Sequence, residues 1–204
     1  MGGRRTSLAG MFNKPLGMSQ TGAMAAAILM AAGYDAKQPL VDPLCGSGTF
    51  CLEAAMMAKQ MAPGLKRTFA LMGWPAFRQG QWAFLKHDAQ ARAGNLDWPL
   101  IFASDIESDT VLRLADTIAA NGLSDAVRVA QKNVFECEAN QYGGGPGLVA
   151  INPPYGIRLG SVGKADDLFK GICRHLSHGF KGWKVALIAP RRDLAGQLPF
   201  TARR

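Results

Sequence analysis

Asp42-Pro43-Leu44-Cys45-Gly46-Ser47-Gly48-Thr49 is the stretch that decides the fold. The apolar run before it, residues 39–42, predicts a short buried strand, and residues 49–60 predict a helix. A glycine turn between a strand and a helix lets the backbone approach a ligand closely, because glycine has no Cβ. In open α/β sheets ligands bind beyond the carboxyl ends of the strands, where this turn lies. The stretch therefore predicts a ligand site as well as a fold class.

Strand and helix patterns alternate along the rest of the chain, which is typical of a parallel sheet with helices on both faces. The sequence therefore predicts an α/β fold with a mostly parallel, doubly wound sheet. We expect Ser108 to cap the helix that it begins and Gly122 to end it. Residues 64–98 interrupt the alternation as an insertion with three of the four tryptophans. Besides those above, the predicted helices cover residues 19–32, 108–121 and 164–178, and the strands residues 100–104, 127–131, 148–151 and 184–189.

Composition limits the classes of protein. The 204 residues are 48% hydrophobic and 19% charged, which suits one domain with a sizeable core. No apolar run of about 18 residues and no signal peptide is found, so we expect no membrane partner and a cytoplasmic location. The net charge of +8 favours a polyanionic partner.

The four cysteines lack the paired spacing of a structural zinc site, which indicates reduced thiols. His175 and His178 are three residues apart on one helical face near Cys173, but no second ligand pair accompanies them. We interpret them as the polar edge of an amphipathic helix. No metal is expected.

Asn152-Pro153-Pro154-Tyr155 follows the apolar run 148–151. The amide oxygen of Asn152 and the carbonyl of Pro153 can both accept from an exocyclic amine. The two prolines fix the backbone so that these acceptors stay aimed, and Tyr155 can stack on a flat ring. This pattern suits a base that has been taken out of its nucleic-acid stack.

A second set of polar side chains lies at predicted strand ends. Asp42 could hold an ammonium group there, and Asp105 could accept from both hydroxyls of a ribose. The turn at 46–48 lacks the Lys-Ser/Thr of a P-loop, and it lacks the full spacing of a nicotinamide site. An adenosyl ligand without phosphates fits these residues better than ATP, GTP or a dinucleotide.

The sequence resembles class I S-adenosylmethionine-dependent methyltransferases with a Rossmann-like fold. Within them it is most similar to the THUMP-associated RNA guanine-N2 methyltransferases, of which the bacterial 23S ribosomal RNA enzyme of the RlmL type is the example. The resemblance covers about residues 14–190. The stretches that carry it are Asp42–Thr49 with Glu53–Ala58, Ala62–Leu65 with Arg67 and Phe69, Ser104–Ile106, and Asn152–Gly156 with Arg158–Gly160.

The resemblance implies S-adenosyl-L-methionine as cofactor, RNA and in particular 23S ribosomal RNA as substrate, and a role in rRNA processing. It implies that Asn152, Pro153 and Tyr155 hold the target amine and base. Asn133 stands where the family usually has an aspartate that binds the adenine amino group. The implied cofactor contacts are Asp42, Cys45, Gly46, Ser47, Gly48, Thr49, Asp105, Ile106, Asn133 and Asn152.

The chain departs from the family pattern at its ends. Residues 1–13 match poorly, so we expect one methyltransferase domain over residues 14–204, without its THUMP domain and truncated at a C-terminal hairpin. Three functions stay open: guanine-N2 methylation of ribosomal RNA, adenine-N6 methylation of DNA or RNA, and cofactor binding without catalysis.

Overall fold

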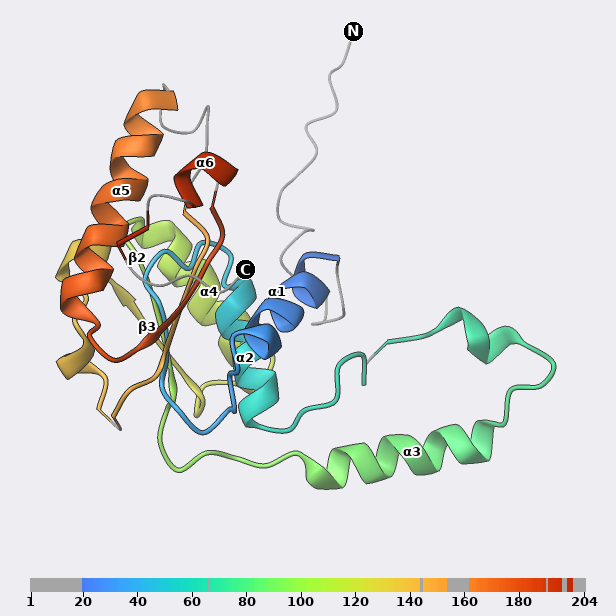
Figure 1. Ribbon diagram of the computed structural model, residues 1–204. Helices are drawn as coiled ribbons and strands as arrows, with labels where there is room; N and C mark the ends of the chain where they lie inside the picture. The colour runs from blue at the N-terminus through green and yellow to red at the C-terminus, as the bar shows by residue number, and fades with distance from the viewer. Residues whose placement is uncertain are drawn as a thin grey trace, which may run out of the picture.

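A computed structural model describes residues 20–65, 67–143, 145–153, 162–189, 191–195 and 198–199. Its sheet has five parallel strands in the order β3-β2-β1-β4-β5 (Figure 1). The α/β prediction with a parallel sheet is therefore confirmed. The strands are β1 (Leu40–Asp42), β2 (Ile101–Asp105), β3 (Val127–Gln131), β4 (Leu148–Ile151) and β5 (Lys184–Leu187).

Helices cover both faces of the sheet, and the alternation of side chains along each strand divides the core between them. Leu40 and Leu148 pack with α1, α2 and α4, whereas Val41 and Val149 pack with α5 on the opposite face. The helices are α1 (Gln20–Ala31), α2 (Thr49–Ala58), α3 (Gln79–Arg92), α4 (Ser108–Ala120), α5 (Val162–Gly179) and α6 (Arg192–Ala195), with short 3-10 turns η2 (Ala70–Gly73), η3 (Val134–Glu136) and η4 (Ala139–Gln141).

Two local predictions meet different outcomes at α4. Ser108 is the first helical residue rather than the cap, so that prediction was wrong. The N-cap is Glu107, whose backbone N–H donates to Asp105 Oδ1 at 3.1 Å and so fixes the entry into the helix. The helix ends at Ala120 with Asn121 as its C-cap, and Gly122 stops it as expected, with a left-handed φ of +69°.

Gly48 closes the turn between β1 and α2 in a way that only glycine allows. Its φ is +79°, and a Cβ built there lies 2.3 Å from Leu114 Cδ1 of α4. The absence of a side chain at Gly48 therefore lets α4 pack against the start of α2. This contact positions the turn against the core.

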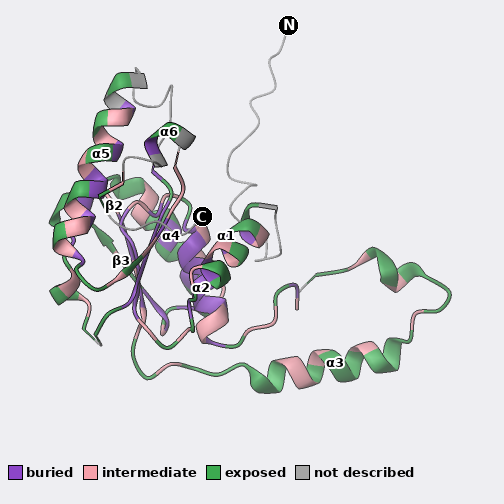
Figure 2. Ribbon diagram, viewed as in Figure 1, coloured by how far each residue is buried: buried purple, intermediate pink, exposed green. Residues whose placement is uncertain are grey.

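The insertion at 64–98 extends from the domain as an arm, which is the name used below for these residues (Figures 1 and 2). It holds α3, a helix that the sequence analysis missed because no residue of α3 is buried and no apolar periodicity marks it. The root of the arm is fastened to the domain. Lys59, at the end of α2, donates to Asn95 at 3.1 Å and to both oxygens of Asp125 at 2.6 Å, and Asp125 also accepts from the N–H of Leu96 at 2.9 Å.

Asp125→Ala is expected to destabilise the protein by about 2–4 kcal/mol, because it leaves the buried Lys59 ammonium without its anion. Although burial alone would raise the pKa of Asp125, the hydrogen bonds from Lys59 and Leu96 lower it. The pair thus stabilises the fold at neutral pH and loses its effect as the pH falls below about 4. Urea unfolding measures the change, with exposed Asp116→Ala on α4 as control. Equal losses in both variants contradict the prediction.

Gly48→Ala is expected to lower the free energy of unfolding by more than about 2 kcal/mol, since left-handed strain adds to the clash with Leu114. Gly122→Ala is the matched control, because its φ is also positive while nothing lies within 4 Å of the new Cβ. Thermal unfolding of both variants isolates the steric part. If Gly122→Ala were as destabilising as Gly48→Ala, the close packing on α4 would be refuted.

Candidate functional site

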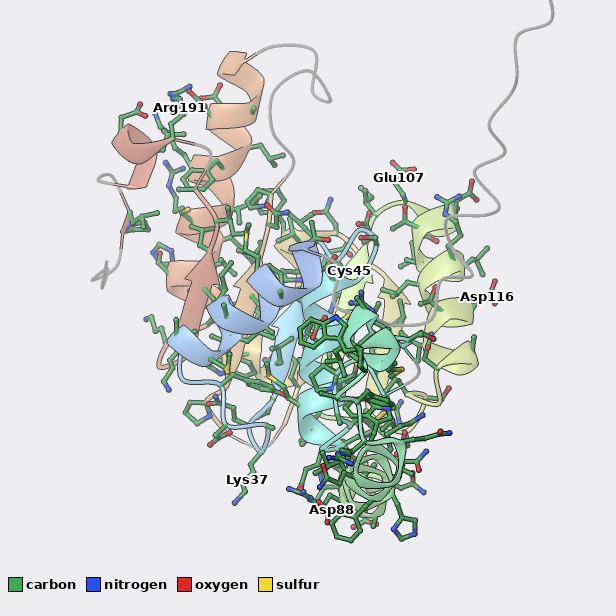
Figure 3. The ribbon with its side chains drawn as sticks, turned by 90° about the vertical axis from the view of Figure 1, so that its right-hand side faces the viewer. Lys37, Cys45, Asp88, Glu107, Asp116 and Arg191 are labelled. Carbon is green, nitrogen blue, oxygen red and sulfur yellow. The ribbon has the colours of Figure 1, made fainter. Side chains whose placement is uncertain are left out.

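The carboxyl ends of β1, β2 and β4 lie side by side in the centre of the sheet, because β1 pairs with both of the others. Asp42 ends β1, Asp105 ends β2, and Asn152 directly follows β4. The structure thus brings together residues that are far apart in the sequence. In Figure 3, Cys45 of the glycine turn and Glu107 after β2 both lie above Lys37, which precedes β1. This end of the sheet is the candidate site.

The glycine turn is joined to the end of β2 by two hydrogen bonds that its backbone N–H groups donate, one to a side chain and one to a backbone carbonyl. Gly46 N–H donates to Asp105 Oδ2 at 3.0 Å, and Cys45 N–H donates to the Ser104 carbonyl at 2.9 Å. The second oxygen of Asp105 accepts from Glu107 N–H. The Asp105 carboxylate is therefore held in one orientation by two backbone donors, and each of its oxygens retains acceptor capacity for a ligand hydroxyl.

Ser47 is exposed at the tip of the turn, and its hydroxyl lies 3.4 Å from the hydroxyl of Thr49 in the first turn of α2. Gly46 has a φ of +50° and open space around it. The turn thus presents backbone N–H groups, two hydroxyls and little side-chain bulk at the start of α2. A helix N-terminus with this surface accepts a carboxylate.

Asp42 is a buried carboxyl that lacks a partner on one oxygen. Only 2% of the residue is exposed, and Oδ1 makes no hydrogen bond with the described part of the chain. The pKa of Asp42 is raised to about 8: burial is the main cause, the hydrogen bond from the Leu44 N–H opposes it, and the charge of Asp105 adds to it. An unpaired buried acceptor of this kind favours a cation beside it.

Side chains after β2 and β3 add an apolar part to this end of the sheet. Ile106 is 55% exposed, and its carbonyl accepts from the amide of Gln131 at 3.0 Å. Asn133 caps η3, because its Oδ1 accepts from the N–H of Phe135 at 3.1 Å. That bond uses part of the acceptor capacity of Asn133 and orients its amide.

Phe135 was missed by the sequence analysis. Its ring is 44% exposed, and it lies edge-on to His175 of α5 at 5.7 Å between centroids. An aromatic residue two positions after Asn133 was the available signal, but no periodicity distinguishes it from a core residue. Phe135 offers an exposed flat surface in the segment that follows β3.

Asn152 is exposed and Pro153 is buried at the end of β4. The carbonyl of Ile151 accepts from Ile188 N–H at 3.1 Å, which fixes the backbone just before Asn152. Tyr155 and Arg158 lie outside the described residues. Of the motif, the structure therefore describes Asn152 and Pro153. The exposed amide of Asn152 follows a backbone segment that the sheet holds through Ile151.

The site contains no ionised thiol. Cys45 and Cys51 are both buried, and burial raises the pKa of each thiol well above its usual range. They remain protonated and serve as packing residues. Within the described ranges no cluster of three or more histidine, cysteine or acidic side chains could hold a metal ion, and no helix is long and apolar enough to cross a membrane.

Three solved structures resemble this one over most of its length. SMU.472, a protein assigned as a methyltransferase and crystallised with SAH, is 28% identical with a TM-score of 0.80, and the match covers 95% of this chain and 51% of that one. A predicted N6-adenine-specific DNA methylase from Listeria monocytogenes is 27% identical with a TM-score of 0.76, over 90% and 47%. A possible methylase from Clostridium difficile is 26% identical with a TM-score of 0.72, over 90% and 47%.

This chain therefore spans about half the length of these three proteins. The likeness places its five-stranded sheet among methyltransferase folds, as the glycine turn and the order of the strand-end residues predicted. The model of the family of RMKL-like methyltransferase domains matches residues 11–199, which include every candidate site residue named above. The chain belongs to the family of RMKL-like methyltransferase domains.

Proposed function

We propose that this domain uses S-adenosyl-L-methionine to methylate the exocyclic N2 amine of a guanine in ribosomal RNA. The observation that carries the cofactor assignment is Asp42, a buried carboxyl with an unpartnered oxygen next to a glycine turn. A cationic, phosphate-free ligand satisfies that carboxyl, and the methyltransferase family is consistent with it.

The candidate cofactor-site residues that the structure describes each have a role in this proposal. Asp42 faces the cationic methionine part, and the turn at 46–48 with Thr49 approaches its carboxylate. Asp105, fixed by two backbone donors, accepts from the ribose hydroxyls. Ile106 and Phe135 offer apolar surface to the adenine, and Asn133 hydrogen-bonds to it. Cys45 packs behind the turn.

Asn152 and Pro153 hold the target amine. When bound, the cofactor supplies an electrophilic methyl group on a sulfonium. The Asn152 amide oxygen and the Pro153 carbonyl accept from the amine, turn its lone pair toward the methyl carbon and stabilise the positive charge that develops on nitrogen. The nitrogen then loses a proton to water. Tyr155, outside the described residues, is proposed to stack on the base.

The alternative is adenine N6 as the acceptor, in DNA or RNA. It is favoured by the likeness to the Listeria protein, which is a predicted N6-adenine-specific DNA methylase. Asn152 and Pro153 could hold either amine, because both bases present an exocyclic NH₂. We prefer guanine N2 because the insertion motif at 62–69 resembles the RNA enzymes. The same resemblance leads us to propose 23S ribosomal RNA as the substrate and the cytoplasm as the location. It also leads us to propose that a THUMP domain of the full-length protein contributes to RNA binding.

Transfer of labelled methyl groups to protein-free ribosomal RNA, and separately to duplex DNA, tests the proposal. Label in N2-methylguanosine after digestion supports it. Label in N6-methyladenine would show that the substrate is adenine rather than guanine, while methyl transfer to an exocyclic amine would stand. Cofactor binding without any transfer favours the third function, a domain that binds the cofactor and does not catalyse.

Asn152→Ala is expected to lower kcat by about 10²–10³-fold, because one of the two acceptors for the amine is lost. The affinity for S-adenosylhomocysteine is expected to stay within about threefold, since the cofactor is held mainly by the ends of β1 and β2. Single-turnover assays and calorimetry measure the two effects. Asn140→Ala, at an exposed asparagine in η4, is the control. An unaltered rate in Asn152→Ala removes the mechanism.

Asp42→Asn tests the buried carboxyl through pH. Because burial raises the folded pKa to about 8 and the unfolded value is about 4, the folded state holds its proton more tightly. The carboxyl is therefore least destabilising below pH 4, and wild-type stability falls as the pH rises toward 8, by up to about 1.4 kcal/mol per pH unit.

The Asp42→Asn variant has no carboxyl proton to lose at this position. Its free energy of unfolding in urea should therefore change less between pH 5 and 8 than that of the wild type. S-adenosylhomocysteine, whose ammonium group can pair with Asp42, should reduce the loss in the wild type. Asp116→Asn controls for a change of surface charge. Parallel pH curves for wild type and Asp42→Asn argue against an unpartnered carboxyl.

A further inference from the structure

The arm exposes large aromatic side chains. Trp74 is 67% exposed, Phe84 71% and Trp98 66%, and all three belong to residues 64–98. Phe135, in the candidate site, is less exposed at 44% and is the other large aromatic residue that is exposed in the described part of the chain. In Figure 3 the arm points toward the viewer, with its side chains around the labelled Asp88. Exposed aromatic rings gathered on one projecting segment mark a binding surface.

The arm is held together by aromatic contacts of its own. Trp82 of α3 lies edge-on to Phe69 at 5.7 Å and tilted against Phe77 at 6.4 Å between centroids. These contacts join α3 to the segment that runs out to it. The rings of Trp74, Phe84 and Trp98 are left outside this cluster and face solvent. The packed rings of Phe69, Phe77 and Trp82 thus hold the arm together, while a second set of rings is exposed to solvent.

The charge of the arm selects the chemistry of its partner. Residues 64–98 contain five lysines and arginines and two aspartates. Arg78 and Lys86, which flank the aromatic positions of α3, form no ion pair within the described ranges. The whole chain carries +8, so a second copy would be repelled and a polyanion attracted.

We propose that the arm binds a single-stranded stretch of the nucleic-acid substrate, with bases stacked on Trp74, Phe84 and Trp98 and phosphates beside Arg78 and Lys86. Aromatic rings interleaved with cations are the surface that single strands bind without sequence preference. This inference rests on the proposed function, because it assigns a surface to the same substrate.

The position of the arm determines how long that substrate must be. The arm leaves the domain after α2, at the opposite end of this helix from the glycine turn. A helix of ten residues is about 15 Å long, which equals about four to five nucleotides of stacked strand. A target base in the site and a strand on the arm therefore require an oligonucleotide longer than about five nucleotides.

Fluorescence anisotropy with a labelled 30-nucleotide single-stranded RNA tests the arm. Each of Trp74→Ala, Phe84→Ala and Trp98→Ala is expected to raise Kd at least fivefold. Arg78→Ala with Lys86→Ala is expected to reduce the slope of log Kd against log salt concentration by about 1–2. Met24→Ala and Leu112→Ala, at exposed apolar positions of α1 and α4, are the matched controls and should leave Kd unchanged.

Methylation assays separate this inference from the proposed function. If the wild type methylates RNA and the arm variants bind it as the wild type does, the arm proposal is overturned and the function stands. If arm variants lose affinity while the wild type transfers no methyl group, the arm stands and the function fails. If the aromatic variants change sedimentation from dimer to monomer with RNA affinity intact, the arm is a contact between copies and the proposal is overturned.

Discussion

The hydrogen bond from Gly46 N–H to the Asp105 carboxylate joins the two strand ends on which the site depends. It fixes the glycine turn over the end of β2, and the same carboxylate fixes the entry into α4 through Glu107. Leu114 of α4 then packs against Gly48, where no Cβ intervenes. These contacts fix β2, the glycine turn and α4 relative to one another, and they therefore determine the geometry of the candidate site.

Burial and hydrogen bonding distinguish Asp42 from Asp105, the two acidic residues at the ends of β1 and β2. Asp105 has a backbone donor for each oxygen, so its carboxylate is held in one orientation without a ligand. Asp42 lies one strand away with an unpartnered oxygen and a raised pKa. The fold therefore places a carboxylate suited to neutral hydroxyls beside one suited to a cation. An adenosyl group linked to an amino acid carries both kinds of partner on one molecule.

The central strands were predictable because burial on both faces makes them continuous apolar runs, and strand-end polar residues follow directly from the runs. Helix α3 was not predictable, because none of its residues is buried and it therefore lacks the apolar stripe that marks the helical period in a sequence. The cap prediction at Ser108 was wrong because the helix begins one residue earlier than expected: Glu107 is the N-cap, and its N–H donates to the carboxylate of Asp105 two residues before it. Phe135 was overlooked because exposure of an aromatic ring depends on the path of the chain after β3.

Lys59 and the glycine turn lie at opposite ends of α2. The ion pair between Lys59 and Asp125 and the hydrogen bonds to Asn95 and Leu96 fix the arm to one end, and the turn proposed to face the cofactor occupies the other. The strand proposed to bind the arm and the cofactor proposed to bind the turn therefore lie at the two ends of one helix. Thermodynamic linkage then requires reciprocity: whatever a strand on the arm does to cofactor affinity, the cofactor does to the affinity of the strand.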